Sequence, residues 1–183
     1  MTDPSAESCG SDCVSRRLFL ASTGAVTATL LLGEIFPGRV HGQNADAPVE
    51  VSKLPRKKIG QVSTLEQDRP VPFDYPTDHY LNNCLLVKLG EKAGGGLGEA
   101  QDIVAFSGRC THMGGSLDGL YNAEHKVAGP CAEHLTTFDL TRHGMVVAGH
   151  ATQALTQVLL EVDGDDIYAT GLVGLLYGYS RNG

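Results

Sequence analysis

The sequence predicts an all-β fold, an antiparallel sandwich or barrel, and three observations carry this prediction. Short apolar runs recur at close spacing after residue 43. The 183 residues include 23 Gly and 8 Pro, a content typical of short strands joined by many turns. After residue 43, the sequence shows no long run with the 3.6-residue period of an amphipathic helix.

The expected strands can be followed in order along the chain. Asp163-Gly164 separates two apolar runs and predicts a tight hairpin turn. Gly94-Gly95-Gly96 predicts a flexible hairpin tip, and not a phosphate-binding loop, because no helical pattern follows it. The strand-like segments are 58–65, 83–89, 102–107, 145–148, 157–162, 166–170 and 172–177.

The first 42 residues predict an export signal and linker, which leaves residues 43–183 as one domain. Arg16-Arg17 precedes a run of 16 uncharged residues, Leu18 to Gly33, shorter than the ~20 residues of a membrane-spanning helix. The pattern resembles a twin-arginine signal, which directs export of proteins that are already folded. It implies a periplasmic protein, with membrane association only if the leader is not cleaved.

The charge of the predicted domain excludes one class of partner. From position 43 onward, 17 Asp and Glu residues oppose 11 Lys and Arg residues, a net charge of −6. Without a basic block that would neutralise phosphates, nucleic acid is not an expected partner. The acidic surface could steer a basic redox protein such as a small cytochrome, or could simply confer solubility.

The five cysteines do not predict a disulfide scaffold, because their number is odd and their spacing irregular. Cys9 and Cys13 precede the apolar run of the leader. Cys84 lies in a strand-like run, where a buried free cysteine is ordinary packing. The remaining two, Cys110 and Cys131, are therefore available for other chemistry.

Two short pairs of candidate ligands, Cys110-Thr111-His112 and Cys131-Ala132-Glu133-His134, carry that chemistry. Each pair offers one thiolate and one imidazole, as in a Rieske-type [2Fe–2S] cluster, where two Cys hold one iron and two His the other. The oxidised core with two thiolates is neutral, whereas a four-Cys cluster is dianionic, so electron uptake is easier here. We therefore predict a Rieske-type cluster on Cys110, His112, Cys131 and His134.

Zinc also accepts two Cys and two His, so a zinc-stabilised binding module without redox function is the competing interpretation. Common zinc fingers place a Cys pair before a His pair in a small unit, whereas each pair here is mixed and lies in a large β domain. Glycines at 114, 115 and 129 flank the pairs, as expected where backbone N–H groups approach inorganic sulfur.

Both ligand pairs, read as Cys-Thr-His-Met-Gly and Cys-x-x-His, resemble the cluster-binding boxes of the Rieske superfamily. The resemblance extends to the small subunit of arsenite oxidase. It implies a heterodimer in which a large molybdopterin subunit passes electrons to this chain, and this chain to a cytochrome c or a cupredoxin. The segments that carry it are 72–76, 86–90, 102–107, 149–152 and 171–178.

Two departures from the superfamily pattern concern the cluster loops. Gly115 and Glu133 stand where many Rieske proteins have cysteines that form a disulfide, so no such bridge is expected. Thr136 and Phe138 stand where respiratory Rieske proteins have a Ser and a Tyr whose hydroxyls bond sulfur. Because Phe138 cannot donate a hydrogen bond, we expect a potential below the respiratory type. Glu133 would add negative charge and lower the potential if it lies near the cluster; the alternative is a solvated loop glutamate.

His150 belongs to a segment that the resemblance places in a third loop near the cluster, with a possible part in proton or electron exit. Two other assignments within the superfamily stay open. One is a sister molybdoenzyme with another substrate, such as iodate reductase, because substrate chemistry resides on the large subunit. The other is a quinol-oxidising respiratory complex, which the absent disulfide and Phe138 disfavour.

Overall fold

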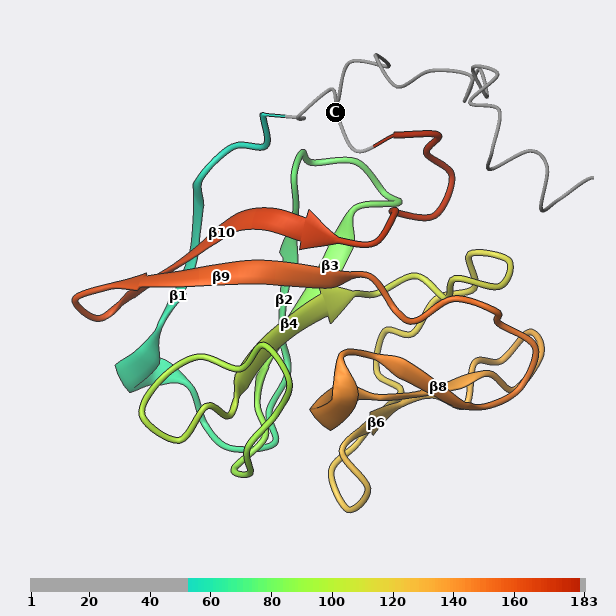
Figure 1. The fold of residues 1–183 in the computed structure, drawn as a ribbon, viewed down its shortest axis with the longest axis horizontal. Coiled ribbons are helices and arrows are strands. Elements are labelled where there is room, and N and C mark those ends of the chain that lie inside the picture. Colours follow the sequence, from blue (N-terminus) through green and yellow to red (C-terminus); the bar gives the residue numbers. More distant parts are fainter. Residues whose placement is uncertain (1–52, 182–183) are drawn as a thin grey trace, which may run out of the picture. The chain divides into compact units, whose positions relative to one another are not determined.

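A computed structural model of the chain describes residues 53–181, which belong to one compact unit. The predicted leader, including Arg16-Arg17, lies outside the described residues. The described residues form two antiparallel sheets and two short 3-10 turns (Figure 1), which confirms the all-β prediction. Within this range no helix has the length and apolarity needed to span a membrane.

The larger sheet has six strands in the order β1-β10-β9-β4-β3-β2. It curls until its two edges lie within side-chain reach of each other. Lys57 Nζ on the first edge strand donates to the backbone carbonyl of Asp74 on the last, at 2.8 Å. Its strands are β1 (Lys57–Gln61), β2 (Val71–Asp74), β3 (Asn83–Lys88), β4 (Ile103–Ser107), β9 (Gln157–Asp163) and β10 (Asp166–Val173).

The smaller sheet is inserted into the chain between β4 and β9, and we call residues 108–156 the insert. In Figure 1 it lies beside one end of the larger sheet, where β6 and β8 are labelled. Its strands, in the order β5-β6-β7-β8, are β5 (Tyr121–Asn122), β6 (Val127–Ala128), β7 (Thr137–Asp139) and β8 (Met145–Ala148). The 3-10 turns are η1 (Val62–Thr64), after β1, and η2 (Leu140–Arg142), between β7 and β8.

Strands β3 and β4 are buried on both faces and serve two hydrophobic cores. Successive side chains of a strand point to opposite faces. Val104 and Phe106 accordingly pack in the core that the insert shares, whereas Ile103 and Ala105 pack in the core inside the curled sheet. This explains why the apolar run at 102–107 shows no alternation of apolar and polar residues, and it packs the insert against the sheet.

The predicted strands agree with the structure except at two places. The segment 62–65 is mostly a 3-10 turn, and the predicted strand at 172–177 is wrong beyond Val173, where β10 ends. The Asp163-Gly164 hairpin joins β9 to β10 as predicted. The glycine tip is fixed to the rest of the fold, because Gly94 donates to the Thr141 carbonyl at 2.7 Å and accepts from Gln157 Nε2 at 2.8 Å.

Candidate redox centre

The two ligand-bearing loops of the insert have the same backbone turn. In loop 1 (Cys110–Gly115) and loop 2 (Cys131–Thr136), the N–H of the first residue donates to the carbonyl of the sixth, at 2.9 and 2.8 Å. The N–H of the fifth residue donates to the carbonyl of the first, at 2.8 Å in both loops. The fifth residues, Gly114 and Leu135, both have positive φ, 75° and 59°. Each loop therefore presents its cysteine from an equivalent position.

The four predicted ligands are brought together at the ends of these loops. Cys110 and Cys131 are each 1% exposed, and their thiols lie within hydrogen-bonding reach of one another. The rings of His112 and His134 lie perpendicular to each other, with centroids 4.7 Å apart, nearer the surface. Two sulfurs thus lie inside and two imidazoles outside, as two irons with different ligand pairs require.

The chemistry of this donor set fits a [2Fe–2S] cluster. His112 Nδ1 is buried without a hydrogen-bond partner, an arrangement that costs free energy unless a metal occupies the lone pair. Burial raises the pKa of the Cys110 thiol, and the nearby Cys131 raises it further, so iron binding is what would hold this sulfur as a thiolate. When bound, the cluster supplies one-electron transfer.

A structural zinc ion and a two-iron cluster need different arrangements of the same four ligands. A structural zinc ion needs four ligands around one point. Within residues 53–181, no group of three or more His, Cys, Asp or Glu side chains is placed to hold one ion. A two-iron cluster differs, because only two protein ligands meet at each iron.

Gly115 and Glu133 face each other across the gap between loops 1 and 2. A Cβ built at Gly115 would lie 3.6 Å from Glu133 Cβ and 2.7 Å from Cys131 Sγ. Gly115 thus keeps space next to a ligand sulfur. The described cysteines, Cys84, Cys110 and Cys131, are all free, so no disulfide joins the loops.

Thr136 and Phe138 lie directly behind the cysteines, and both are fully buried. The Thr136 hydroxyl is within hydrogen-bonding reach of the Cys110 sulfur, and it accepts the His150 N–H at 3.1 Å. The Phe138 ring packs in the core that contains Cys110 and Cys131. One hydroxyl can therefore tune the sulfur, whereas Phe138 offers only apolar packing.

A third loop, Gly149–Gln153, contacts both cluster loops. The His150 ring centroid lies 5.7 Å from that of His112 and 6.2 Å from that of His134. The Gln153 carbonyl accepts from the Thr111 hydroxyl at 2.9 Å. Neither Thr111 nor Gln153 stands out in the sequence, because their contact joins residues 42 positions apart.

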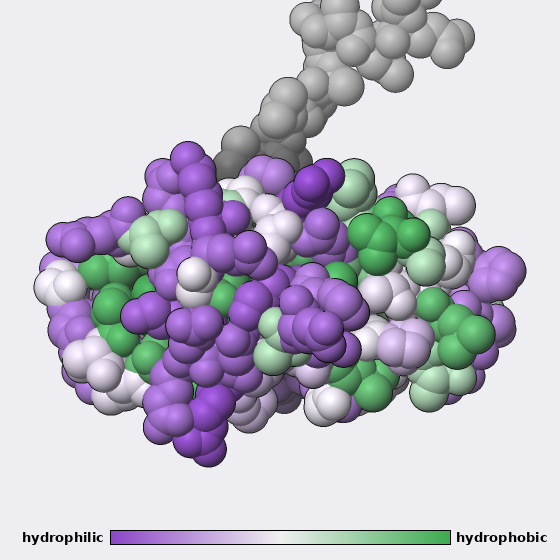
Figure 2. Space-filling view, turned by 90° about the horizontal axis from the view of Figure 1, so that it is seen from below, coloured by the Kyte–Doolittle hydropathy of each residue, from purple (hydrophilic) through white to green (hydrophobic). Residues whose placement is uncertain are grey.

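Exposed apolar side chains adjoin the ligand histidines at the tips of loops 1 and 2. Met113 and Leu135, at the tips of loops 1 and 2, are 60% and 66% exposed, and Val147 on β8 is 51% exposed. Figure 2 shows apolar patches at the end that carries β6 and β8 in Figure 1, whereas the middle of this face is mainly hydrophilic. Such a surface around solvent-facing imidazoles suits contact with another protein.

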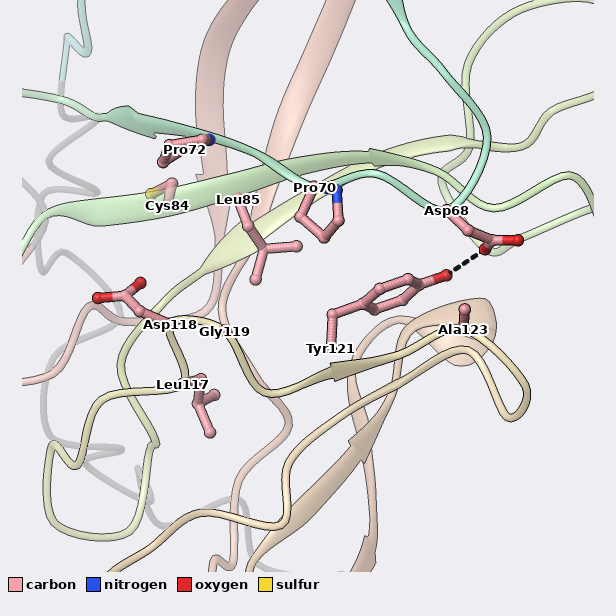
Figure 3. Close-up of a pocket in the computed structure, with 10 residues that line it drawn as sticks. All are labelled: Asp68, Pro70, Pro72, Cys84, Leu85, Leu117, Asp118, Gly119, Tyr121 and Ala123. Atoms are coloured by element: carbon pink, nitrogen blue, oxygen red, sulfur yellow. Dashed lines mark hydrogen bonds between the residues drawn. The ribbon is translucent and has the colours of Figure 1, made fainter.

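A cavity of about 410 Å³ lies apart from the four predicted ligands (Figure 3). At one end, Asp68 accepts from the Tyr121 hydroxyl and from Lys126 Nζ, both at 2.6 Å. Lys126 and Tyr121 lower the pKa of Asp68, whereas burial and Asp68 raise that of Tyr121. This network ties the chain before β2 to the insert. The cavity is lined by Asp68, Pro70, Pro72, Cys84, Leu85, Leu117, Asp118, Gly119, Tyr121 and Ala123.

Two named relatives match the chain over most of its length. The chain is 51% identical over 170 residues to the iodate reductase subunit IdrB of Denitromonas iodatirespirans, covering 93% of this chain and 87% of that protein. It is 52% identical over 167 residues to the subunit of the same name from Pseudomonas sp. (strain SCT), covering 91% and 83%.

The fold has a solved counterpart. The soluble domain of Rieske protein II from Sulfolobus acidocaldarius matches with a TM-score of 0.61 at 24% identity, covering 70% of this chain and 83% of that chain. The family model described as Rieske [2Fe-2S] domain matches residues 49–159, which include both ligand pairs. The chain therefore belongs to the Rieske [2Fe–2S] domain family, and its cofactor is a Rieske-type [2Fe–2S] cluster.

Proposed function

We propose that the chain is the electron-transfer subunit of an iodate-reductase-type enzyme. The observation that carries this proposal is the identity of 51% and 52% to two subunits of iodate reductase, over more than nine-tenths of this chain. These relatives support the iodate reductase alternative over the arsenite oxidase that the sequence segments favoured. A quinol-oxidising role has no support among them.

The catalytic partner would be a large molybdopterin-containing subunit, as the resemblance to this class of enzymes implies. In a reductase, electrons flow from a cytochrome c or a cupredoxin through this chain to the partner, opposite to the direction in arsenite oxidation. Reduction of iodate to iodide takes six electrons, so a one-electron subunit must deliver them singly. Iron ligation is assigned to Cys110, His112, Cys131 and His134, and substrate chemistry to the partner.

The direction of electron flow tests the proposal. The complex is isolated with its cluster, reduced by one equivalent of dithionite, and mixed with iodate in a stopped-flow spectrometer. Rapid return of the oxidised absorption supports an iodate reductase. Failure to reoxidise, together with reduction of the oxidised complex by arsenite, would instead support the arsenite oxidase assignment.

We also propose that the protein is periplasmic and exported in the folded state. Arg16-Arg17 followed by an uncharged run supports this, as does the need to insert iron and sulfide before export. Arg16→Lys together with Arg17→Lys should retain the cluster-loaded protein in the cytoplasm on cell fractionation. Unchanged export of that variant would contradict the twin-arginine route.

A further inference from the structure

The segment after β10 returns to the insert and lies along loop 1. The Thr156 hydroxyl donates to the Leu175 carbonyl at 2.7 Å, and the Leu176 side chain is 2% exposed. We call residues 174–179 the C-terminal strap. It begins at Gly174, whose φ of 96° turns the chain out of the strand direction.

Tyr177 on this strap packs against the backbone of loop 1. A Cβ built at Gly114 would lie 2.3 Å from Tyr177 Cε1, 2.5 Å from Cδ1 and 2.9 Å from Cζ. The ring therefore lies against the Gly114 Cα atom. Gly114 is the αL residue of loop 1, and it is only two positions from the ligand His112.

Loop 1 also contacts the third loop. The Thr111 hydroxyl donates to the Gln153 carbonyl at 2.9 Å. Thr111, Gln153 and the strap together line a hollow of about 140 Å³. Loop 1 is thus bonded to the third loop through Thr111 and packed against the strap at Gly114, with no covalent link to loop 2.

We propose that Tyr177 is a positioning residue of the cluster site. Its ring holds Gly114, and through it His112, in the geometry that binds iron, the task that a disulfide between the loops performs in many Rieske proteins. The ring carbons make the contact, so the phenol hydroxyl is not needed. The inference rests on the family's cluster and is independent of the substrate.

Substitutions on the strap test this role in the full chain, purified with its cluster and its co-purifying subunit. Tyr177→Ala should accelerate loss of visible cluster absorbance about tenfold, which equals about 1.4 kcal/mol. It should also broaden the lines of the reduced-state EPR spectrum. Tyr177→Phe should restore both properties. Tyr179→Ala is the matched control, because Tyr179 lies on the same strap but packs edge-to-face against His79, at a centroid distance of 6.4 Å.

Two glycine substitutions test the contact between Tyr177 and Gly114 from the side of loop 1. Gly114→Ala adds a methyl group that collides with the ring, at a backbone φ of 75°. Gly119→Ala carries nearly the same backbone strain, at φ 72°, with no atom within 4 Å of the new Cβ. Cluster loss should accelerate in Gly114→Ala and not in Gly119→Ala, and Tyr177→Ala should partly relieve the Gly114→Ala defect.

Three results would overturn the inference. One is a Tyr177→Ala protein whose cluster lifetime and EPR spectrum match those of Tyr179→Ala. Another is a Tyr177→Phe protein that is as defective as Tyr177→Ala. The third is equal behaviour of Gly114→Ala and Gly119→Ala, which decides the matter even if Tyr177→Ala does not fold.

Discussion

Replacing Gly115 and Glu133 by cysteine should join loops 1 and 2 through a disulfide. The Cβ position at 115 lies 3.6 Å from Glu133 Cβ, within the span of roughly 3.5–4.5 Å found across disulfides. The bridge would close a loop of about 18 residues. The Cβ separation therefore permits a bridge, provided that the Cys131 sulfur shifts to admit the new Cβ, which would lie 2.7 Å from it.

The expected gain follows from two opposing effects. Restricting the unfolded chain by a loop of this length is worth about 3 kcal/mol. The new Cβ lies 2.7 Å from Cys131 Sγ, and relieving such a contact costs about 1 kcal/mol. The net stabilisation is about 2 kcal/mol, which raises the melting temperature of a domain of this size by roughly 6–10 °C.

The melting temperature of the cluster-loaded double variant should be measured with and without a thiol reductant that spares the cluster. The matched control is the double serine variant, Gly115→Ser with Glu133→Ser, which makes the same changes in packing and charge without a bridge. Two free thiols that persist under oxidising conditions would refute the assigned loop geometry. So would a bridge that forms but leaves the melting temperature at that of the serine control.

Three further predictions concern single side chains. Thr136→Val removes the donor to the Cys110 sulfur and should lower the reduction potential by about 40–90 mV, if the hydrogen bond strengthens by about 1–2 kcal/mol on reduction; voltammetry should find Thr136→Ser close to the wild type, and an unchanged potential in the valine variant would remove this role. Phe138→Tyr places a hydroxyl among the ligand cysteines and should raise the potential by a similar amount, and a variant whose potential does not rise counts against the account of Phe138. Lys126 and Tyr121 lower the pKa of Asp68, so its carboxylate stabilises the fold above about pH 4, and this stabilisation is lost as the pH falls through the lowered pKa. Asp68→Asn should therefore cost about 1–2 kcal/mol in the free energy of unfolding by urea at neutral pH and progressively less below about pH 4, whereas an equal cost at every pH would contradict the assignment.

The strands that the sequence predicted are those with enough residues to show a pattern. Four of them, β3, β4, β8 and β9, were expected within one residue of their bounds. Strands β5, β6 and β7 have only two or three residues, too few for any periodicity to appear. Pro70 and Pro72 concealed β2, since proline is accepted in an edge strand but argues against a strand in sequence.

The predicted strand at 172–177 failed for a tertiary reason. Leu175 and Leu176 continue the apolar run of β10, but Gly174 turns the chain toward the insert. The same residues then form the strap beside loop 1. The local sequence shows that these residues are apolar, but it does not show which part of the fold they pack against.

For the site, the sequence supplied the candidate ligands and the structure supplied their supports. Two mixed Cys–His pairs are a local pattern, and they predicted the cluster directly. Thr111, Gln153 and Tyr177 carry no such pattern, because each acts through a neighbour that is distant along the chain. Gln153 acts through its backbone carbonyl, which no side-chain motif can reveal.

The sharing of β3 and β4 between two cores has a thermodynamic consequence. Because alternate side chains of these strands pack in different cores, unfolding of either strand would disrupt both cores. The insert and the curled sheet should therefore melt as a single cooperative unit. The colour of the iron centre would then report the integrity of the entire domain, and its bleaching curve should superimpose on the calorimetric transition.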